Sequence, residues 1–145
     1  KINDSMGKYI AEQTILRLIK NNINPSKAEV AILGLTFKEN CPDIRNSKIT
    51  DVIYELKNWG VNVVVDDPWA DALDVDRIYG ISLGKVDSNH QVDSLIVAVG
   101  HNEFRGLDPE ELRALCKGSA PVLADVKSLY DRHALGEQGF TVFRL

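Results

Sequence analysis

Cysteine is scarce in this sequence: Cys41 and Cys116 are the only two in 145 residues, and they form no CxxC pair. Two isolated cysteines provide neither a disulfide framework nor a zinc-binding pattern, so a reducing compartment, the cytoplasm, is expected. The sequence also has no stretch of 18 apolar residues, and residues 1–4 lack the apolar run of a signal peptide. A membrane is therefore not an expected partner.

A surplus of positive charge is absent as well. The sequence has 17 Lys and Arg residues against 21 Asp and Glu residues, which gives a net charge of −4 and a pI near 5.3. Nucleic acid is not an expected partner, because proteins dedicated to binding it usually carry a basic surplus. A few local positive groups can still hold a small anion. The three histidines are scattered without ligand spacing, so no metal site is expected.

Apolar residues are plentiful, at 44% of the chain, which is enough for the core of one domain. Apolar runs typical of buried parallel strands alternate with helix patterns. We expect strands at 29–36, 61–65, 81–83, 94–99, 122–126 and 140–143, and helices at 4–20, 49–59, 70–78, 109–117 and 131–136. This alternation predicts an α/β fold: a Rossmann-like, doubly wound, mainly parallel sheet of about six strands, preceded by one helix.

The opening helix has apolar residues on two sides. One side carries Met6, Tyr9 and Ile10, and the other carries Ile15, Leu18 and Ile19. A helix of this kind usually contacts two partners. In a doubly wound sheet, ligands bind beyond the carboxyl ends of the strands, so the loops to consider are 37–46, 66–69, 100–106 and 127–130.

The loop after the first strand lacks the glycines of a dinucleotide site. It has Gly34 alone where GxGxxG would be needed, so this domain is not expected to bind NAD by itself. Lys38 and Arg45 instead precede a helix N-terminus, where Asn46 or Ser47 can cap the first turn. Two interpretations stay open: the two cations form an anion site, or they are surface cations paired with Glu39 and Asp43.

The run GLTFKENCPDIRNSKI at residues 34–49 resembles the UDP-glucose/GDP-mannose dehydrogenase family, at the start of its C-terminal UDP-binding domain. The resemblance continues through VDDPW at 65–69 and DVK at 125–127. Residues 40–47, NCPDIRNS, are most similar to the bacterial branch of the family, which oxidises UDP-N-acetylhexosamines for capsule, Vi-type or O-antigen polysaccharide. The segment at residues 2–6 resembles the end of the long helix that leaves the family's central dimerisation domain.

The resemblance implies an NAD-dependent oxidoreductase that converts a sugar C6 alcohol to a carboxylate in two steps, with a covalent thiohemiacetal on cysteine. Phe37 and Lys38 match a pair that contacts the UDP-sugar, and Arg45 matches an arginine that reaches NAD. Lys127 stands where the family has a substrate-binding arginine. A lysine keeps the positive charge but lacks the paired N–H donors with which a guanidinium binds two oxygens at once. No catalytic residue is assigned to this chain.

The resemblance also implies that parts of the enzyme lie elsewhere. We expect residues 1–24 to be the end of the linking helix and residues 25–145 to be the UDP-binding domain. The NAD-binding domain and the Gly-Gly-x-Cys segment are missing from the sequence. The chain is therefore expected to be inactive alone, to work with its own N-terminal and central domains, and to belong to a homo-oligomeric enzyme. The alternatives are a free-standing nucleotide-binding or regulatory module, and a structural domain for oligomer contacts.

Four other features near the predicted loops have two interpretations each. Cys41 is either a nucleophile or a loop residue, and the first needs a nearby base or cation. Asp66 and Asp67 end a strand where a dinucleotide fold keeps its ribose-binding acid, although a turn or cap role suits them better here. His101 either lines the cleft or is a solvated loop residue. Trp69 is either an interface aromatic or part of the core edge.

Overall fold

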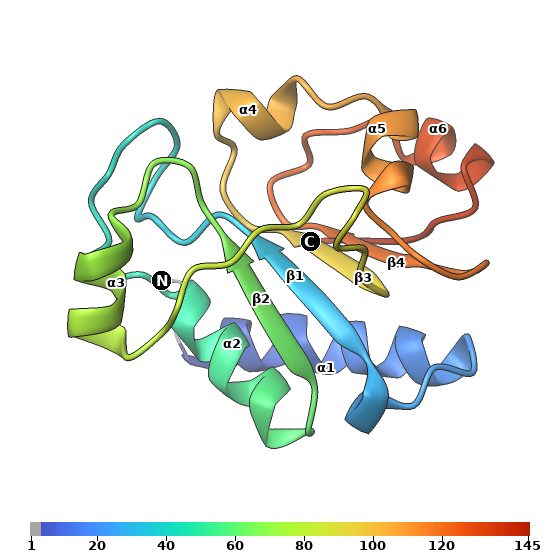
Figure 1. Cartoon of the computed structure of the whole chain (residues 1–145). Coiled ribbons are helices and arrows are strands. Elements are labelled where there is room, and N and C mark those ends of the chain that lie inside the picture. Colours follow the sequence, from blue (N-terminus) through green and yellow to red (C-terminus); the bar gives the residue numbers. More distant parts are fainter. Residues whose placement is uncertain (1–3) are drawn as a thin grey trace.

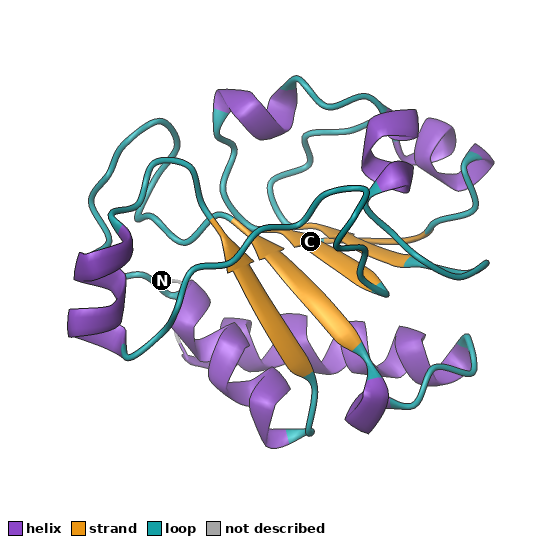
Figure 2. Cartoon of the chain, in the orientation of Figure 1, coloured by secondary structure: helices purple, strands orange, loops and turns teal. Residues whose placement is uncertain are grey.

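In the computed structural model, which describes residues 4–145, parallel strands form one five-stranded sheet with helices on both sides (Figures 1 and 2). The strand order is β2-β1-β3-β4-β5, and every neighbouring pair is parallel. The strands are β1 (Glu29–Leu33), β2 (Asn62–Asp66), β3 (Ser94–Val97), β4 (Val122–Asp125) and β5 (Thr141–Arg144). This confirms the predicted fold class. Residues 1–3, which begin the predicted linking helix, lie outside the described residues.

The sheet has one strand fewer than the sequence predicts. The segment 81–83 makes only an isolated bridge, between Leu83 and Val65. Gly80 ends the preceding helix in the left-handed conformation, with φ of 67°, and the Gly84 amide donates to the Val65 carbonyl at 2.7 Å. The three residues between these glycines are too few to build a ladder against β2.

Helices cover both faces of the sheet, as a doubly wound fold requires. They are α1 (Asp4–Lys20), α2 (Ile49–Asn58), α3 (Ala72–Tyr79), α4 (Asn102–Arg105), α5 (Pro109–Ala114) and α6 (Arg132–Glu137). Figure 1 shows α1 and α2 on one face, α4, α5 and α6 on the other, and α3 beside the β2 edge. Among residues 4–145, no helix combines the length and apolar character needed to cross a membrane.

Strand β1 lies between β2 and β3, and its residues 30–33 are all apolar. Val30 and Ile32 pack into the core on the α1–α2 face, whereas Ala31 and Leu33 pack into the core on the α5–α6 face. All four side chains are at most 1% exposed. A strand buried on both faces has no polar position in its alternation, so its pattern is a run rather than a repeat of two.

Helix α1 packs on the sheet with one side and exposes apolar residues on another. Ile10 and Leu18 are buried against the sheet and α2, whereas Tyr9, Leu16 and Ile19 are 42–49% exposed. The helix thus has two apolar sides, as predicted, but the residues that make up each side differ from the prediction. The prediction put Ile10 and Leu18 on two different sides, and the structure buries both in one core.

Candidate functional site

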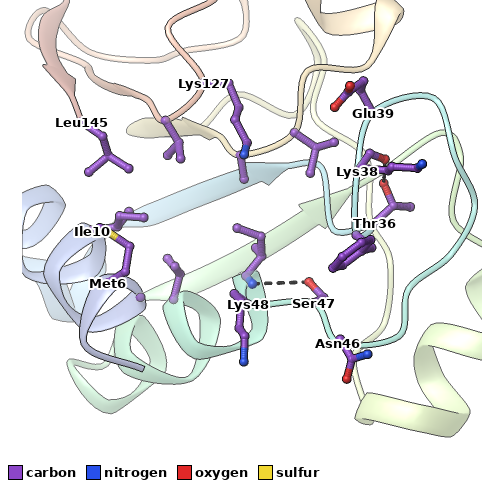
Figure 3. Close-up of a pocket in the computed structure, with 17 residues that line it drawn as sticks. Met6, Ile10, Thr36, Lys38, Glu39, Asn46, Ser47, Lys48, Lys127 and Leu145 are labelled. Atoms are coloured by element: carbon purple, nitrogen blue, oxygen red, sulfur yellow. Dashed lines mark hydrogen bonds between the residues drawn. The ribbon is translucent and has the colours of Figure 1, made fainter. Parts of the chain in front are cut away.

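A cavity of about 440 Å³ lies at the carboxyl ends of β1, β3 and β4 (Figure 3). The chain winds from β1 outward to β2 and then returns to wind through β3, β4 and β5, so the winding direction reverses between β1 and β3. Ligands of doubly wound folds bind at this reversal. The lining residues are Met6, Gly7, Ile10, Thr36, Phe37, Lys38, Glu39, Asn46, Ser47, Lys48, Ile49, Val52, Ala98, Val99, Val126, Lys127 and Leu145.

The cavity combines an apolar interior with cationic groups at its margin. Side chains of α1, of the first turns of α2 and of the segments after β3 and β4 supply the apolar surface. In Figure 3 the Lys127 side chain extends from the segment after β4 toward β1, while Lys38 lies to its right, beside Thr36 in the loop after β1. An apolar site with a few placed charges suits a ligand that has both a flat apolar part and negative charge.

Three of the four residues singled out from the sequence line this cavity: Phe37, Lys38 and Lys127. The Phe37 side chain is 60% exposed, so its ring can stack on a planar group without prior rearrangement. Among the described residues, neither Lys38 nor Lys127 makes an ion pair. Both amino groups are available to an anionic ligand, and the suggested pairing of Lys38 with Glu39 does not form.

The fourth residue, Arg45, does not line the cavity. Its guanidinium Nε and Nη2 each donate to a carboxylate oxygen of Asp43, both at 3.0 Å, and its side chain is 79% exposed. The hydrogen bonds from Arg45 lower the pKa of Asp43 to about 2, and Asp43 in turn raises the pKa of Arg45. The surface-pairing interpretation therefore holds for Arg45, whose Nη1 group donates to neither oxygen of Asp43 and stays available to a second anion.

The first turn of α2 also faces the cavity. The N-cap residue, Lys48, makes no side-chain capping bond. Ser47 performs part of that role, because its Oγ accepts a hydrogen bond from the Ile49 amide at 3.3 Å. Asn46 does not cap the helix; it takes a left-handed conformation with φ of 59°. Backbone amides at the start of a ten-residue helix add positive potential at the cavity edge.

Behind the cavity lies a buried Asp67–His101 pair. The His101 Nε2 is 3.0 Å from Asp67 Oδ1 and 3.1 Å from Oδ2, and both side chains are fully buried. Asp67 Oδ2 also accepts hydrogen bonds from the amides of Leu35 (2.6 Å) and Thr36 (3.0 Å), and Oδ1 accepts one from Trp69 (2.8 Å). A buried carboxylate with this many donors is well satisfied.

The structure overturns both interpretations of His101 given by the sequence. The side chain neither lines the cavity nor meets solvent, because it is 0% exposed. Asp67 has the turn role, since it accepts backbone amides of the loop after β1. One signal could have found the pair: β2 and β3 flank β1, so the residues that follow them converge on the loop that follows β1.

Two further residues of the loops are now placed. Trp69 is half-buried; its ring stacks on His101 with centroids 6.0 Å apart, and its Nε1 donates to Glu103 Oε1 at 2.9 Å. Trp69 thus covers the buried pair. Cys41 is half-buried in the loop after β1. Within residues 4–145, no group of three or more His, Cys, Asp or Glu side chains is arranged to hold a metal ion.

Known proteins resemble this chain in sequence over most of its length. A model of the UDP-glucose/GDP-mannose dehydrogenase family, UDP binding domain, matches residues 31–132. The UDP-N-acetyl-D-glucosamine 6-dehydrogenase of Salmonella typhi is 48% identical over 128 residues, which cover 88% of this chain and 30% of the relative. The UDP-N-acetyl-D-glucosamine 6-dehydrogenase of Pseudomonas aeruginosa is 41% identical over 131 residues, which cover 90% and 31%.

The fold also has solved counterparts. The structure of NDP-N-acetyl-D-galactosaminuronic acid dehydrogenase from Methanosarcina mazei Go1 superposes with a TM-score of 0.86 at 20% identity, over 98% of this chain and 29% of that one. The chain thus spans about 30% of the length of the relatives it matches. It belongs to the UDP-glucose/GDP-mannose dehydrogenase family and corresponds to the UDP-binding domain.

Proposed function

We propose that this chain is the UDP-sugar-binding domain of an NAD-dependent nucleotide-sugar 6-dehydrogenase. The enzyme oxidises the C6 alcohol of a UDP-N-acetylhexosamine to the uronate in two steps. The observation that carries the proposal is the cavity at the winding reversal, which collects Phe37, Lys38 and Lys127 from two distant parts of the sequence. The names of the relatives from Salmonella typhi and Pseudomonas aeruginosa support the choice of substrate class.

Each part of the cavity has a role in this proposal. Lys38 and Lys127 neutralise the diphosphate, together with the backbone amides of the first turn of α2. Phe37 and the apolar interior hold the flat and apolar parts of the ligand. With the diphosphate fixed, the sugar C6 is held at a defined place for the groups that the other domains supply. The contribution to catalysis is therefore positional.

NAD accepts the hydride when it is bound, and it is held mainly by a domain that is not in this chain. The fit of this chain to NAD is limited, since the loop after β1 offers Gly34 alone and cannot bring a diphosphate against the backbone. Arg45 is the residue that reaches the cofactor in the proposal, either with the free Nη1 side of its guanidinium or after exchanging Asp43 for the new anion. The exposed position of Arg45 allows this exchange.

The proposal includes an arrangement of domains and subunits. Within the segment 1–24, helix α1 is the end of the helix that leads from a central dimerisation domain, and residues 25–145 form the UDP-binding domain of a homo-oligomeric enzyme. The length ratio supports this arrangement, because the relatives are about three times longer than the chain. The exposed apolar side of α1 is consistent with a helix that meets a further partner.

Titration of the purified chain with UDP, followed by amide NMR, tests the proposal. We expect shifts at residues 34–48 and around Lys127, and none of comparable size with NAD. Lys38→Ala removes one charge-assisted contact and raises the Kd for UDP by about tenfold. The matched control is Lys57→Ala, in the last turn of α2, which keeps the wild-type Kd. Shifts confined to other loops, or equal Kd values for both variants, would contradict the proposed site.

A further inference from the structure

The Phe37–Lys38 segment is held at both ends by one buried side chain. His101 Nδ1 accepts a hydrogen bond from the Asn40 amide at 2.9 Å, and its Nε2 lies 3.1 Å from the Thr36 hydroxyl. Thr36 immediately precedes the proposed ligand-binding pair, and Asn40 follows it by two residues. The His101 ring thus spans the base of the short loop that presents both ligand-binding side chains.

The hydrogen bonds fix the tautomer of this ring. The Asn40 amide can only donate, so Nδ1 must be an unprotonated acceptor. Nε2 therefore carries the hydrogen and donates it toward Asp67 and the Thr36 hydroxyl. The hydroxyl in turn donates to the Lys38 carbonyl at 3.0 Å. The chain of donors runs from the His101 ring to the backbone of Lys38.

The loop conformation needs such support, because Asn40 has a left-handed backbone with φ of 54°. A non-glycine residue in this region is held there by surrounding contacts. Asn40 receives such contacts from Asn102, the first residue of α4. Its Oδ1 accepts a hydrogen bond from the Asn102 amide at 2.9 Å, and its Nδ2 donates to Asn102 Oδ1 at 3.2 Å. Phe37 and Lys38 are both exposed, so their side chains add little support, and the segment's own further tie is the Phe37 amide, which donates to the Asp43 carbonyl at 2.7 Å.

The geometry points to His101 as a positioning residue for the UDP-sugar site: its neutral ring, oriented by Asp67, holds the 36–40 loop in the conformation that presents Phe37 and Lys38 to the ligand. His101 touches no ligand in this arrangement. It acts through its hydrogen bonds with Thr36 and Asn40. The carboxylate of Asp67, the first residue after β2, accepts from Nε2 and so orients the ring. This inference rests on the proposed function and extends it to residues outside the cavity.

Two substitutions separate the contacts made by the two ring nitrogens. His101→Gln places a donor near the position of Nε2 and loses the acceptor for the Asn40 amide. His101→Asn keeps an acceptor near Nδ1 and loses the donor toward Asp67. The expected order of Kd for UDP is wild type, then Asn, then Gln, with the Gln variant weaker than wild type by about five- to tenfold. His133→Gln, at an exposed position on α6, is the matched control and keeps the wild-type Kd.

A second measurement uses the unaltered chain, in case the buried substitutions prevent folding. Long-range ¹H–¹⁵N NMR of the His101 ring should show the Nε2–H tautomer, and saturating UDP should slow hydrogen exchange of the Asn40 amide. A folded Gln variant that binds within twofold of wild type overturns the inference, and so does an Nδ1–H tautomer. If the wild-type chain binds no UDP, the proposed function fails as well, so the two failures are distinguishable.

Discussion

Lys127 reaches the cavity because the residues around it build a defined turn after β4. Asp125, which is fully buried, accepts hydrogen bonds from the amides of Leu129 (2.9 Å) and Tyr130 (3.0 Å). Ser128 turns the backbone with a positive φ of 56°. The carboxylate therefore fixes the direction in which Lys127 leaves the sheet, and a polar residue at the end of a buried strand has a structural purpose.

Replacement of Lys127 tests whether its positive charge or the shape of its amino group determines the affinity for UDP. Lys127→Ala should weaken UDP binding by about tenfold, because a charge-assisted contact is lost. Lys127→Arg should keep the wild-type affinity or improve it, since the guanidinium fork matches phosphate oxygens. Isothermal titration with UDP measures both. If the Ala variant binds as tightly as wild type, Lys127 only borders the cavity and plays no part in binding.

Cys116 makes the stability of the fold sensitive to alkaline pH. Burial raises the pKa of its thiol from 9.0 to about 12. Above about pH 9 the unfolded chain loses this proton while the folded chain keeps it, so the free energy of unfolding falls as the pH rises from 9 toward 12. Each pH unit in this range costs up to about 1.4 kcal/mol. Burial also raises the pKa of Tyr130, which extends the fall above pH 10.

Urea unfolding at pH 8 and pH 10 checks this prediction. Cys116→Ala lacks the thiol, so its free energy of unfolding should drop by about 1.4 kcal/mol less than that of the wild type between the two pH values. Cys41→Ala removes a half-exposed cysteine from a loop and should behave as the wild type does. An identical drop in all three proteins would show that the buried thiol does not contribute.

The sequence predicted the residues that line the cavity better than the buried residues behind them. Phe37 and Lys38 stand in a motif that can be read without a structure, and the cavity contains both. His101 was misjudged because its burial depends on three segments that meet only in the fold: the loops after β1, β2 and β3. A polar residue in a loop carries no periodicity, so nothing local distinguishes a buried histidine from a solvated one.

At the scale of elements, the contact between α1 and α2 is closer than ordinary helix packing permits for most residues. A Cβ added at Gly7 would lie 2.6 Å from the Asp51 Cβ, which real Cβ atoms do not approach. Gly7 also lines the cavity together with Met6 and Ile10. This glycine in the first half of α1 therefore lets the helix reach α2 at the edge of the site, although glycine lowers helix propensity.

A pair of glycine substitutions separates packing from propensity. Gly7→Ala should destabilise the chain by about 1–3 kcal/mol, because the overpacked contact outweighs a propensity gain of about 1 kcal/mol. Gly136→Ala, on α6, meets nothing within 4 Å and should stabilise the chain by up to about 1 kcal/mol. Thermal or urea unfolding measures both. Stabilisation by both substitutions would mean that α1 can move away from α2 without cost.

The two longest helices were predicted well, whereas the four-residue helix α4 was missed. Helices α1 and α2 carry 17 and 10 residues, enough for a period of 3.6 to be recognised. Helix α4 has four residues and lies in a segment that the sequence marked only as a loop. The predicted strand at 81–83 failed for a related reason: three apolar residues satisfy a pattern without being able to pair along an edge.

At the scale of the whole molecule, the cavity lies open at one end of the sheet, with α1 forming one of its walls. The side chains proposed to bind the ligand come from the segments after β1 and β4, and the proposal gives none of them a role in the oxidation itself. The chain also spans only about 30% of its relatives. Binding and chemistry are therefore divided in the proposed enzyme, and the two can be measured separately.

This division predicts that the 145-residue chain binds UDP but does not turn over. With UDP-N-acetylglucosamine and NAD, the chain alone should give no NADH absorbance, because Gly34 alone does not make a dinucleotide site and the sequence contains no Gly-Gly-x-Cys, the segment that the family resemblance implies for the nucleophile. The corresponding full-length protein should form two NADH per sugar. Steady turnover by the chain alone would refute the division.

In the full-length protein, Lys38→Ala should raise the KM for the UDP-sugar by about tenfold and lower kcat much less, because the lysine binds the diphosphate in the ground state and in the transition state alike. Lys57→Ala is again the control and should change neither constant. A full-length protein that binds UDP but never reduces NAD would favour the regulatory-module alternative. A large fall in kcat with an unchanged KM would move Lys38 from substrate binding into the chemical step, since only an interaction confined to the transition state produces that signature.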